Sequence, residues 1–115
     1  MSDARWGSSS VEKEDASGTL SVGDQCDLLT SDRRRHILRY LISYAEDPVR
    51  TDDLVTYLRD IEHTADTRHI RHVVHHIHLP KLSQKGIITY DADEGRIEYR
   101  PHEGLENLLA FLEER

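Results

Sequence analysis

Residues 67–90 differ in composition from the rest of the chain in a way that suits contact with an anion. These 24 residues contain no Asp or Glu, whereas the remainder carries all 22 acidic residues and 11 of the 15 basic ones. Arg, Lys and His side chains donate hydrogen bonds to phosphates and to base edges. We therefore predict that this segment contacts double-stranded DNA. The residues assigned to the contact are Arg68, His69, Arg71, His72, His75, His76, Lys81 and Lys85, with Arg96 and Arg100 further along the chain.

The spacing of the histidines raises metal binding as an alternative. His72 and His76 are four residues apart, and His69 lies one helical turn earlier. Zinc and nickel accept imidazole nitrogens, commonly together with a carboxylate or a thiolate. However, three ligands in line on one helix rarely converge on one ion, and Cys26 is the chain's single cysteine. We therefore predict no metal site and no cofactor.

Catalytic motifs are not recognisable in the sequence. It has no glycine-rich phosphate loop and no H-E-x-x-H pair, and no two carboxylates stand out in an apolar setting. Ser, His and Asp occur without a motif that would arrange them for nucleophilic catalysis. We predict that the protein is not an enzyme.

A helix must position the cationic side chains, and apolar residues at helical spacing predict one over residues 67–78. Its apolar side chains fall within roughly 100° of one another on a helical wheel, and the Arg and His side chains occupy the other side. The apolar residues are Ile70, Val73, Val74 and Ile77.

We expect this helix to end near Pro80. Leu79 and Leu82 point away from the apolar stripe of the preceding helix, and a proline inside a helix removes a backbone hydrogen bond. The sequence therefore predicts a break, then a short turn over residues 80–85 with Gly86 as its C-terminal cap.

Two amphipathic helices precede this one, with a strand of one or two residues at Val49 between them. Ser31, Thr51 and Asp66 are suited to cap the three helices in turn. The second and third helices, joined by a short polar link, form the skeleton of a helix-turn-helix.

Three successive arginines, residues 33–35, crowd the first turn of the first of these helices. The helix dipole disfavours cations at that end. Either acidic partners within the fold or an external phosphate must offset the placement, and we favour the internal partners.

After Gly86 the apolar pattern changes to a period of two. Residues 87–90 and 96–99 are strand-like and are joined by a turn-rich link, which predicts a hairpin. A last helix follows, whose leucines fall at i, i+3, i+4 and i+7. Those leucines pack on the core or form the seam of a homodimer: Leu105, Leu108, Leu109 and Leu112.

Length and composition fit one small domain over residues 20–115. Residues 1–19 combine Ser, Gly and charge with almost no apolar content, which predicts a disordered tail. A short helical turn is expected within residues 20–29, with Cys26 as a small core residue. No apolar run approaches the length of a membrane span, so we expect a cytoplasmic protein with no membrane partner.

Charge restricts where an anion could bind. The formal net charge is −7 and the pI about 5.5, which argues against indiscriminate binding to nucleic acid. The basic residues comprise 12 Arg and 3 Lys. An acidic, Lys-poor composition resembles that of proteins from salt-accumulating haloarchaea, and the resemblance implies a halophilic origin.

Residues 78–88, HLPKLSQKGII, resemble the H-L-x-x-L-x-x-x-G-[ILV]-[ILV] run of many prokaryotic winged-helix regulators. In those proteins the run lies at the end of the recognition helix and leads into the wing. More narrowly, RRRHILRYL at residues 33–41 and HIHLPKL at residues 76–82 are similar to a haloarchaeal family of small domains of unknown function, generally taken to be winged-helix. One departure is Pro80, which lies in a helix that the regulators keep continuous.

The resemblance and the element order together predict an α+β winged helix-turn-helix with a three-helix core, a two-stranded wing and a C-terminal helix. The expected function is that of a small DNA-binding transcriptional regulator, with residues 67–78 as reader and residues 87–99 as wing. The alternative is an acidic interaction module on the same scaffold that does not bind DNA. Acids covering the reader face would favour that alternative.

Overall fold

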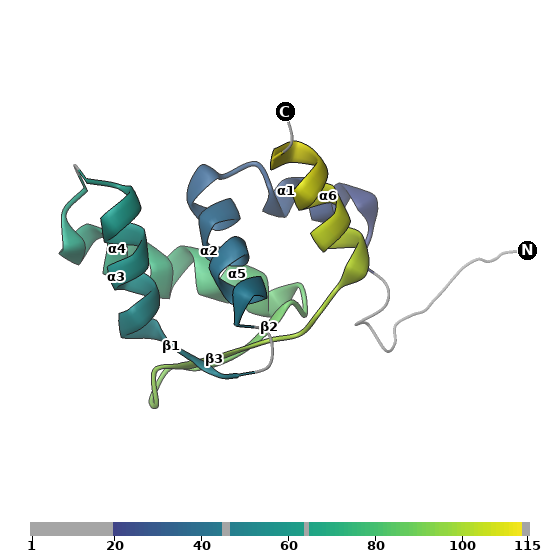
Figure 1. The fold of residues 1–115 in the computed structure, drawn as a ribbon. Helices are drawn as coiled ribbons and strands as arrows, with labels where there is room; N and C mark the ends of the chain where they lie inside the picture. The colour runs from purple at the N-terminus through teal and green to yellow at the C-terminus, as the bar shows by residue number, and fades with distance from the viewer. Residues whose placement is uncertain (1–19, 45–46, 64, 114–115) are drawn as a thin grey trace, which may run out of the picture.

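The computed structural model describes residues 20–44, 47–63 and 65–113, which form several helices and one small sheet (Figure 1). The class is α+β, and the order of elements follows the prediction. The tail predicted for residues 1–19 lies outside the described residues. The elements are α1 (Val22–Leu28), α2 (Asp32–Ser43), β1 (Val49–Arg50), α3 (Thr51–Ile61), α4 (Thr67–Val73), the π-helical segment η3 (Val74–His78), α5 (Leu79–Gln84), β2 (Ile88–Asp91), β3 (Arg96–Tyr99) and α6 (Glu103–Glu113).

An antiparallel sheet of order β1-β3-β2 lies along one side of the helices (Figure 1). The predicted hairpin is confirmed, and Asp91 of β2 pairs with Arg96 of β3. The short strand predicted at Val49 is also confirmed, but it joins the hairpin: Val49 pairs with Ile97. The described sheet therefore has three strands where we predicted a wing of two.

Aliphatic side chains form the core between the helices and the sheet. Leu38 of α2, Leu54 of α3 and Ile97 of β3 are each 0 % exposed. Burying one side chain of this size contributes roughly 1.5–3 kcal/mol. These contacts hold α2 and α3 against the sheet and so fix the helix that follows them.

The helix after α3 does not break at Pro80, so that prediction was wrong. It continues from α4 through η3 into α5. The N–H of Leu79 donates to the carbonyl oxygen of Val74, five residues earlier, so this turn contains one residue more than an α-helical turn. Pro80 stands in the first turn of α5, where a missing N–H is tolerated. A π-turn therefore accommodates the proline without ending the helix.

The extra residue rotates the helix by about one position and changes which side chains are buried. Leu79 and Leu82, which a regular wheel places off the stripe, are 0 % exposed. His78 is 7 % exposed, although we placed it at the flank of the polar face. Ile77, predicted to be in the apolar stripe, is 51 % exposed. The prediction for Ile77 was wrong because it assumed one helical period throughout.

Two of the three predicted caps are confirmed. Ser31 accepts from the N–H of Arg34, and Asp66 accepts from the N–H of Arg68. Thr51 is instead the first residue of α3, with a buried hydroxyl that has no hydrogen-bond partner among the described residues. Gly86 follows α5 with φ 78°, as expected for a C-terminal glycine.

At the other end of the molecule α1 and α6 lie side by side (Figure 1). Cys26 is exposed, so its assignment to the core was wrong. Leu105 and Leu109 of α6 are buried in the protein's own core, which removes them from the predicted dimer seam. No helix within the described ranges combines the length and the apolar content needed to cross a bilayer.

Arg34 ties the helix of α4, η3 and α5 to the start of α2. Its guanidinium donates to the carbonyl oxygens of Leu28 at 2.9 Å and Asp27 at 3.0 Å, and lies 3.4 Å from Nδ1 of His78. Both Arg34 and His78 are 7 % exposed. Since the guanidinium carries only donors, Nδ1 of His78 accepts this hydrogen bond.

Replacing Arg34 should therefore destabilise the whole domain. In R34M the carbonyl oxygens of Leu28 and Asp27 lose a buried donor, which should lower the free energy of unfolding by about 2–4 kcal/mol. Urea denaturation followed by circular dichroism measures the loss. R39M is the matched control, because Arg39 forms a largely exposed ion pair with Glu113, and it should cost no more than about 1 kcal/mol. Equal losses in the two variants would contradict the anchoring role of Arg34.

Candidate nucleic-acid interface

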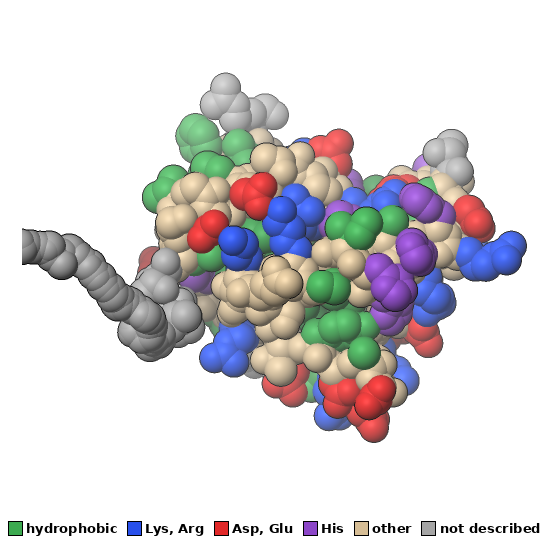
Figure 2. Space-filling view, turned by 180° about the vertical axis from the view of Figure 1, so that it is seen from behind, with side chains coloured by type: hydrophobic (Ala, Val, Ile, Leu, Met, Phe, Trp, Pro, Cys, Tyr) green, Lys and Arg blue, Asp and Glu red, His purple; other side chains and the backbone are tan. Residues whose placement is uncertain are grey.

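The outer side of α4 and η3 carries four of the predicted contact residues in exposed positions: Arg68, His69, His72 and His76. Figure 2 shows histidine side chains gathered at one side of the molecule, with Lys and Arg side chains beside them. We call this surface, together with Arg71, the α4 face. Within the described residues no carboxylate forms an ion pair with the side chains of Arg68, His69, His72 or His76.

Arg71 is also exposed, but it is paired. Its Nη1 lies 2.5 Å from Oδ1 of Asp52, the second residue of α3. The hydrogen bond from Arg71 is the largest of the effects that lower the pKa of Asp52, and Arg50 and His75 act in the same direction. An exposed pair of this kind is weak, so Arg71 can exchange the carboxylate for a phosphate. The exchange leaves Asp52 on the same surface.

His75 does not project freely from the helix as predicted. Its Nδ1 shares a hydrogen bond with the hydroxyl of Tyr90 on β2. The side chain is half-buried, and burial is the main reason that the pKa of His75 is lowered, with smaller effects from Arg71 and His76. His75 therefore joins the helix to the hairpin.

Lys81 and Lys85 are used within the fold. Lys81 lies 2.7 Å from Asp27, and Lys85 lies 3.0 Å from Asp24; both aspartates belong to α1. The hydrogen bonds from these lysines lower the pKa values of the two carboxyls. The C-terminal end of the predicted reading surface is thus screened by acids, and the two lysines dock α1 on α5.

On the sheet, Arg96 and Arg100 are both exposed. Arg96 pairs in register with Arg50 of β1 on one side and Asp91 of β2 on the other. Sequence reasoning missed Arg50, because nothing local indicated that β1 would join the hairpin. The link between β2 and β3 is acidic and exposed, with Asp93 and Glu94. The cations of the sheet therefore lie on its strands rather than at the tip of the hairpin.

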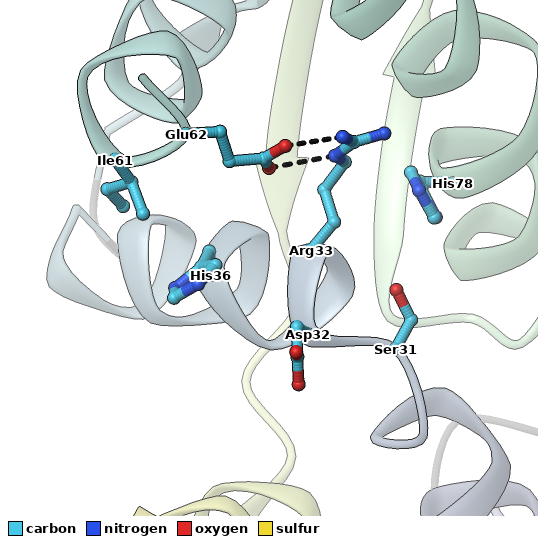
Figure 3. A pocket seen from close by; sticks show the side chains of 7 residues that line it. All are labelled: Ser31, Asp32, Arg33, His36, Ile61, Glu62 and His78. Carbon is cyan, nitrogen blue, oxygen red and sulfur yellow. Dashed lines mark hydrogen bonds and ion pairs between the residues drawn. The ribbon is translucent and has the colours of Figure 1, made fainter. Parts of the chain in front are cut away.

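A cleft of about 540 Å³ lies between the start of α2, the end of α3 and η3 (Figure 3). Arg33 crosses it to Glu62 through two hydrogen bonds, one of 2.8 Å. The hydrogen bond from Arg33 is the main cause of the lowered pKa of Glu62. Arg35 pairs with Asp32. Arg33 and Arg35 therefore have the acidic partners within the fold that we favoured, whereas Arg34 donates to backbone carbonyl oxygens instead.

None of the three acids Glu62, Asp66 and Glu98, which could have covered the α4 face, forms an ion pair with its side chains among the described residues. Glu62 faces Arg33 in the cleft, and Asp66 caps α4. Glu98 is exposed on β3, in register with Thr89. The acids that do approach the predicted residues are Asp52, Asp27 and Asp24, and none of these had been anticipated.

Within the described ranges, no group of three or more His, Cys, Asp or Glu side chains is arranged to hold a metal ion. The chain matches the family described as a domain of unknown function, DUF7344, over residues 26–98. Neither a curated protein nor a solved structure matches it.

The environment of His78 in the cleft predicts acid-sensitive stability. Burial, and then Arg34, lower the pKa of His78 from 6.5 to about 4. The unfolded chain takes up a proton below 6.5 that the folded protein still excludes, so stability is lost as the pH falls through this window. Between about pH 8 and about pH 5, urea denaturation should show a loss of about 2 kcal/mol from this residue.

The variant H78N tests that assignment. Asn keeps an oxygen that can accept from Arg34 but does not titrate, so the dependence of stability on pH should flatten. H63N, which changes an exposed histidine, should behave as the wild type. A wild-type pH dependence in H78N would assign the acid sensitivity to other groups.

Proposed function

We propose that this chain, which belongs to the DUF7344 family of domains of unknown function, is a small winged-helix transcriptional regulator that binds double-stranded DNA. The observation that carries the proposal is the α4 face, an exposed row of Arg and His side chains on a helix segment without carboxylates. The rest of the surface is acidic, since the chain as a whole has a net charge of −7. DNA is therefore expected to approach this face together with the arginines of the adjoining sheet.

The arrangement of elements supports a winged helix. The order α2, β1, α3, α4, β2, β3 and the sheet order β1-β3-β2 are those of a helix-turn-helix followed by a hairpin. In this assignment α4 and η3 enter the major groove, while β2 and β3 form the wing. Arg50 and Arg96, paired in register, would lie against the adjacent phosphates.

Four arginines, Arg50, Arg68, Arg71 and Arg96, supply the charge for this interface, and Asp52 subtracts from it. A surface with so few net charges releases few counterions, so binding without sequence preference is expected to be weak. The exposed histidines add hydrogen-bond donors and acceptors that can read base edges. Recognition would then depend on sequence and groove shape more than on charge.

Two opposite changes at the α4 face test the proposal. R68A removes an exposed cation without a partner and should weaken binding to mixed-sequence DNA roughly 3- to 10-fold, with a salt dependence shallower by about one phosphate contact. D52N releases Arg71 and removes a negative charge, so it should strengthen binding roughly 2- to 5-fold. Fluorescence anisotropy across a salt series measures both.

Each change has a control of equal charge. R39A alters an arginine that pairs with Glu113 on α6, and D53N alters the exposed neighbour of Asp52, which has no ion pair among the described residues. Both should leave DNA binding close to that of the wild type. If R68A and D52N match these controls, α4 is not the reader.

The second candidate is an acidic interaction module on the same fold. It is favoured by the pairing of Arg71, Lys81 and Lys85 with aspartates, which leaves less charge for phosphate. Failure of the folded wild-type protein to bind any DNA at low salt would select this candidate.

The regulator would act as a homodimer through α1 and α6. With Leu105 and Leu109 buried, the apolar surface of α1 and α6 includes Val22, 70 % exposed, Leu112, 37 % exposed, and the half-buried Leu108. A second copy pairing its α6 with this one would cover these side chains and place two readers on one duplex.

Light scattering tests the dimer. L112E places a charge in the proposed seam, so the measured mass should fall from that of a dimer to that of a monomer. A110E, on the opposite side of α6 from Leu112, should stay dimeric. A monomeric wild-type protein at concentrations of about 100 μM, well above those at which specific protein pairs associate, would remove the dimer.

A further inference from the structure

His72 and His76, which the sequence places four residues apart, lie side by side on the α4 face. Their ring centroids are 4.6 Å apart with the ring planes at 40°. Both side chains are exposed. Within residues 20–44, 47–63 and 65–113, no hydrogen bond or ion pair engages their nitrogens. Two adjacent imidazoles with free nitrogens are ligands for a divalent metal ion.

We propose that His72 and His76 form a two-ligand site for a first-row divalent ion of the zinc class, with water in the remaining positions. Two imidazoles on one tetrahedral ion, each at about 2.0–2.1 Å, place their ring centres about 5 Å apart. The observed 4.6 Å is close to this separation, so small side-chain rotations suffice.

The neighbouring histidines are excluded from the site by their contacts or their position. His75 shares a hydrogen bond with Tyr90, and Nδ1 of His78 is occupied by Arg34. His69 lies one turn before His72, and no three-ligand group exists among the described residues. Two ligands on adjacent turns are enough for an open site. Such a site binds an exchangeable ion rather than a structural one.

Electrostatics around the pair tolerate a dication. Two cations of the same helix are compensated, since Arg71 is paired with Asp52 and Lys81 with Asp27, whereas Arg68, one turn before His72, has no ion pair among the described residues. Asp27 lines the same surface hollow as His76. These carboxylates reduce the repulsion that an ion would meet on an otherwise cationic helix.

Occupation would also change the α4 face itself, and this consequence rests on the proposed function. The bound ion would add two positive charges at the centre of the exposed face. Phosphates or base edges would then meet a more positive surface, so the ion should increase DNA affinity.

Titration of the tag-free protein with Zn²⁺ alone tests the site without DNA. Calorimetry should find one ion per chain, and NMR should show the imidazole signals of His72 and His76 shifting together. H72Q and H76Q should each weaken binding at least about tenfold, because the second coordination bond is no longer intramolecular. H69Q, one turn earlier on the same exposed face, should bind as the wild type.

Three results would overturn the site: no binding, equal weakening in H69Q, or undiminished binding in both H72Q and H76Q. The DNA measurement is separate. Zn²⁺ should raise the DNA affinity of the wild type more than that of H72Q. If Zn²⁺ binds the wild type but does not raise its DNA affinity more than that of H72Q, the link between metal and DNA binding is wrong, whereas the metal site remains. If the protein binds no DNA with or without Zn²⁺, the proposed function fails, while the titration still decides the metal site.

Discussion

The π-turn between Val74 and Leu79 is the constraint on which the surface of this domain depends. Because this turn contains one extra residue, the side chains of α5 are rotated about the helix axis relative to those of α4. The segment before the turn buries Ile70 and Val74, and the segment after it buries Leu79 and Leu82, so one continuous helix serves two stretches of core with different phases. A regular α-helix could not bury both pairs. The same shift carries Ile77 outward and His78 inward.

Charge on the α4 face is set by contacts with the neighbouring helices rather than by the composition of the helix itself. The helix segment contains no acid, yet Arg71, Lys81 and Lys85 each meet an aspartate from α3 or α1. Two of these pairs dock α1, and the third joins α4 to the start of α3. Lys81 and Lys85 therefore serve the fold at the C-terminal end of the helix, whereas Arg68 at the other end has no ion pair among the described residues. A composition count overstates the positive potential for this reason.

Prediction from the sequence succeeded for elements that a single local residue pattern determines. It failed where the helical period changes and where the partner of a side chain is distant in the sequence. The caps at Ser31 and Asp66, the hairpin and the strand at Val49 follow from local residue types. The break at Pro80 was predicted wrongly because a helical wheel assumes one period along the whole helix. No residue type in this segment indicates the π-turn that changes the period. Partners distant in sequence were also hidden: Tyr90 for His75 is an example. Register within the sheet brought Arg50 beside Arg96, which no spacing rule anticipates.

The contacts of the α4 face also restrict how it can recognise a partner. The hydrogen bond between His75 and Tyr90 joins the helix to β2, and the exposed pair of Arg71 and Asp52 connects it to α3, so two contacts restrain the helix relative to its neighbours. A rigid surface loses little entropy on binding, which favours a partner of matching shape. In the proposed regulator, its few net charges would provide only weak attraction to DNA in general. Discrimination would then come from the hydrogen bonds of the exposed imidazoles, whose donor and acceptor pattern is changed by whatever occupies their nitrogens. DNA recognition by such a surface would depend on the state of the histidines more than on the number of arginines.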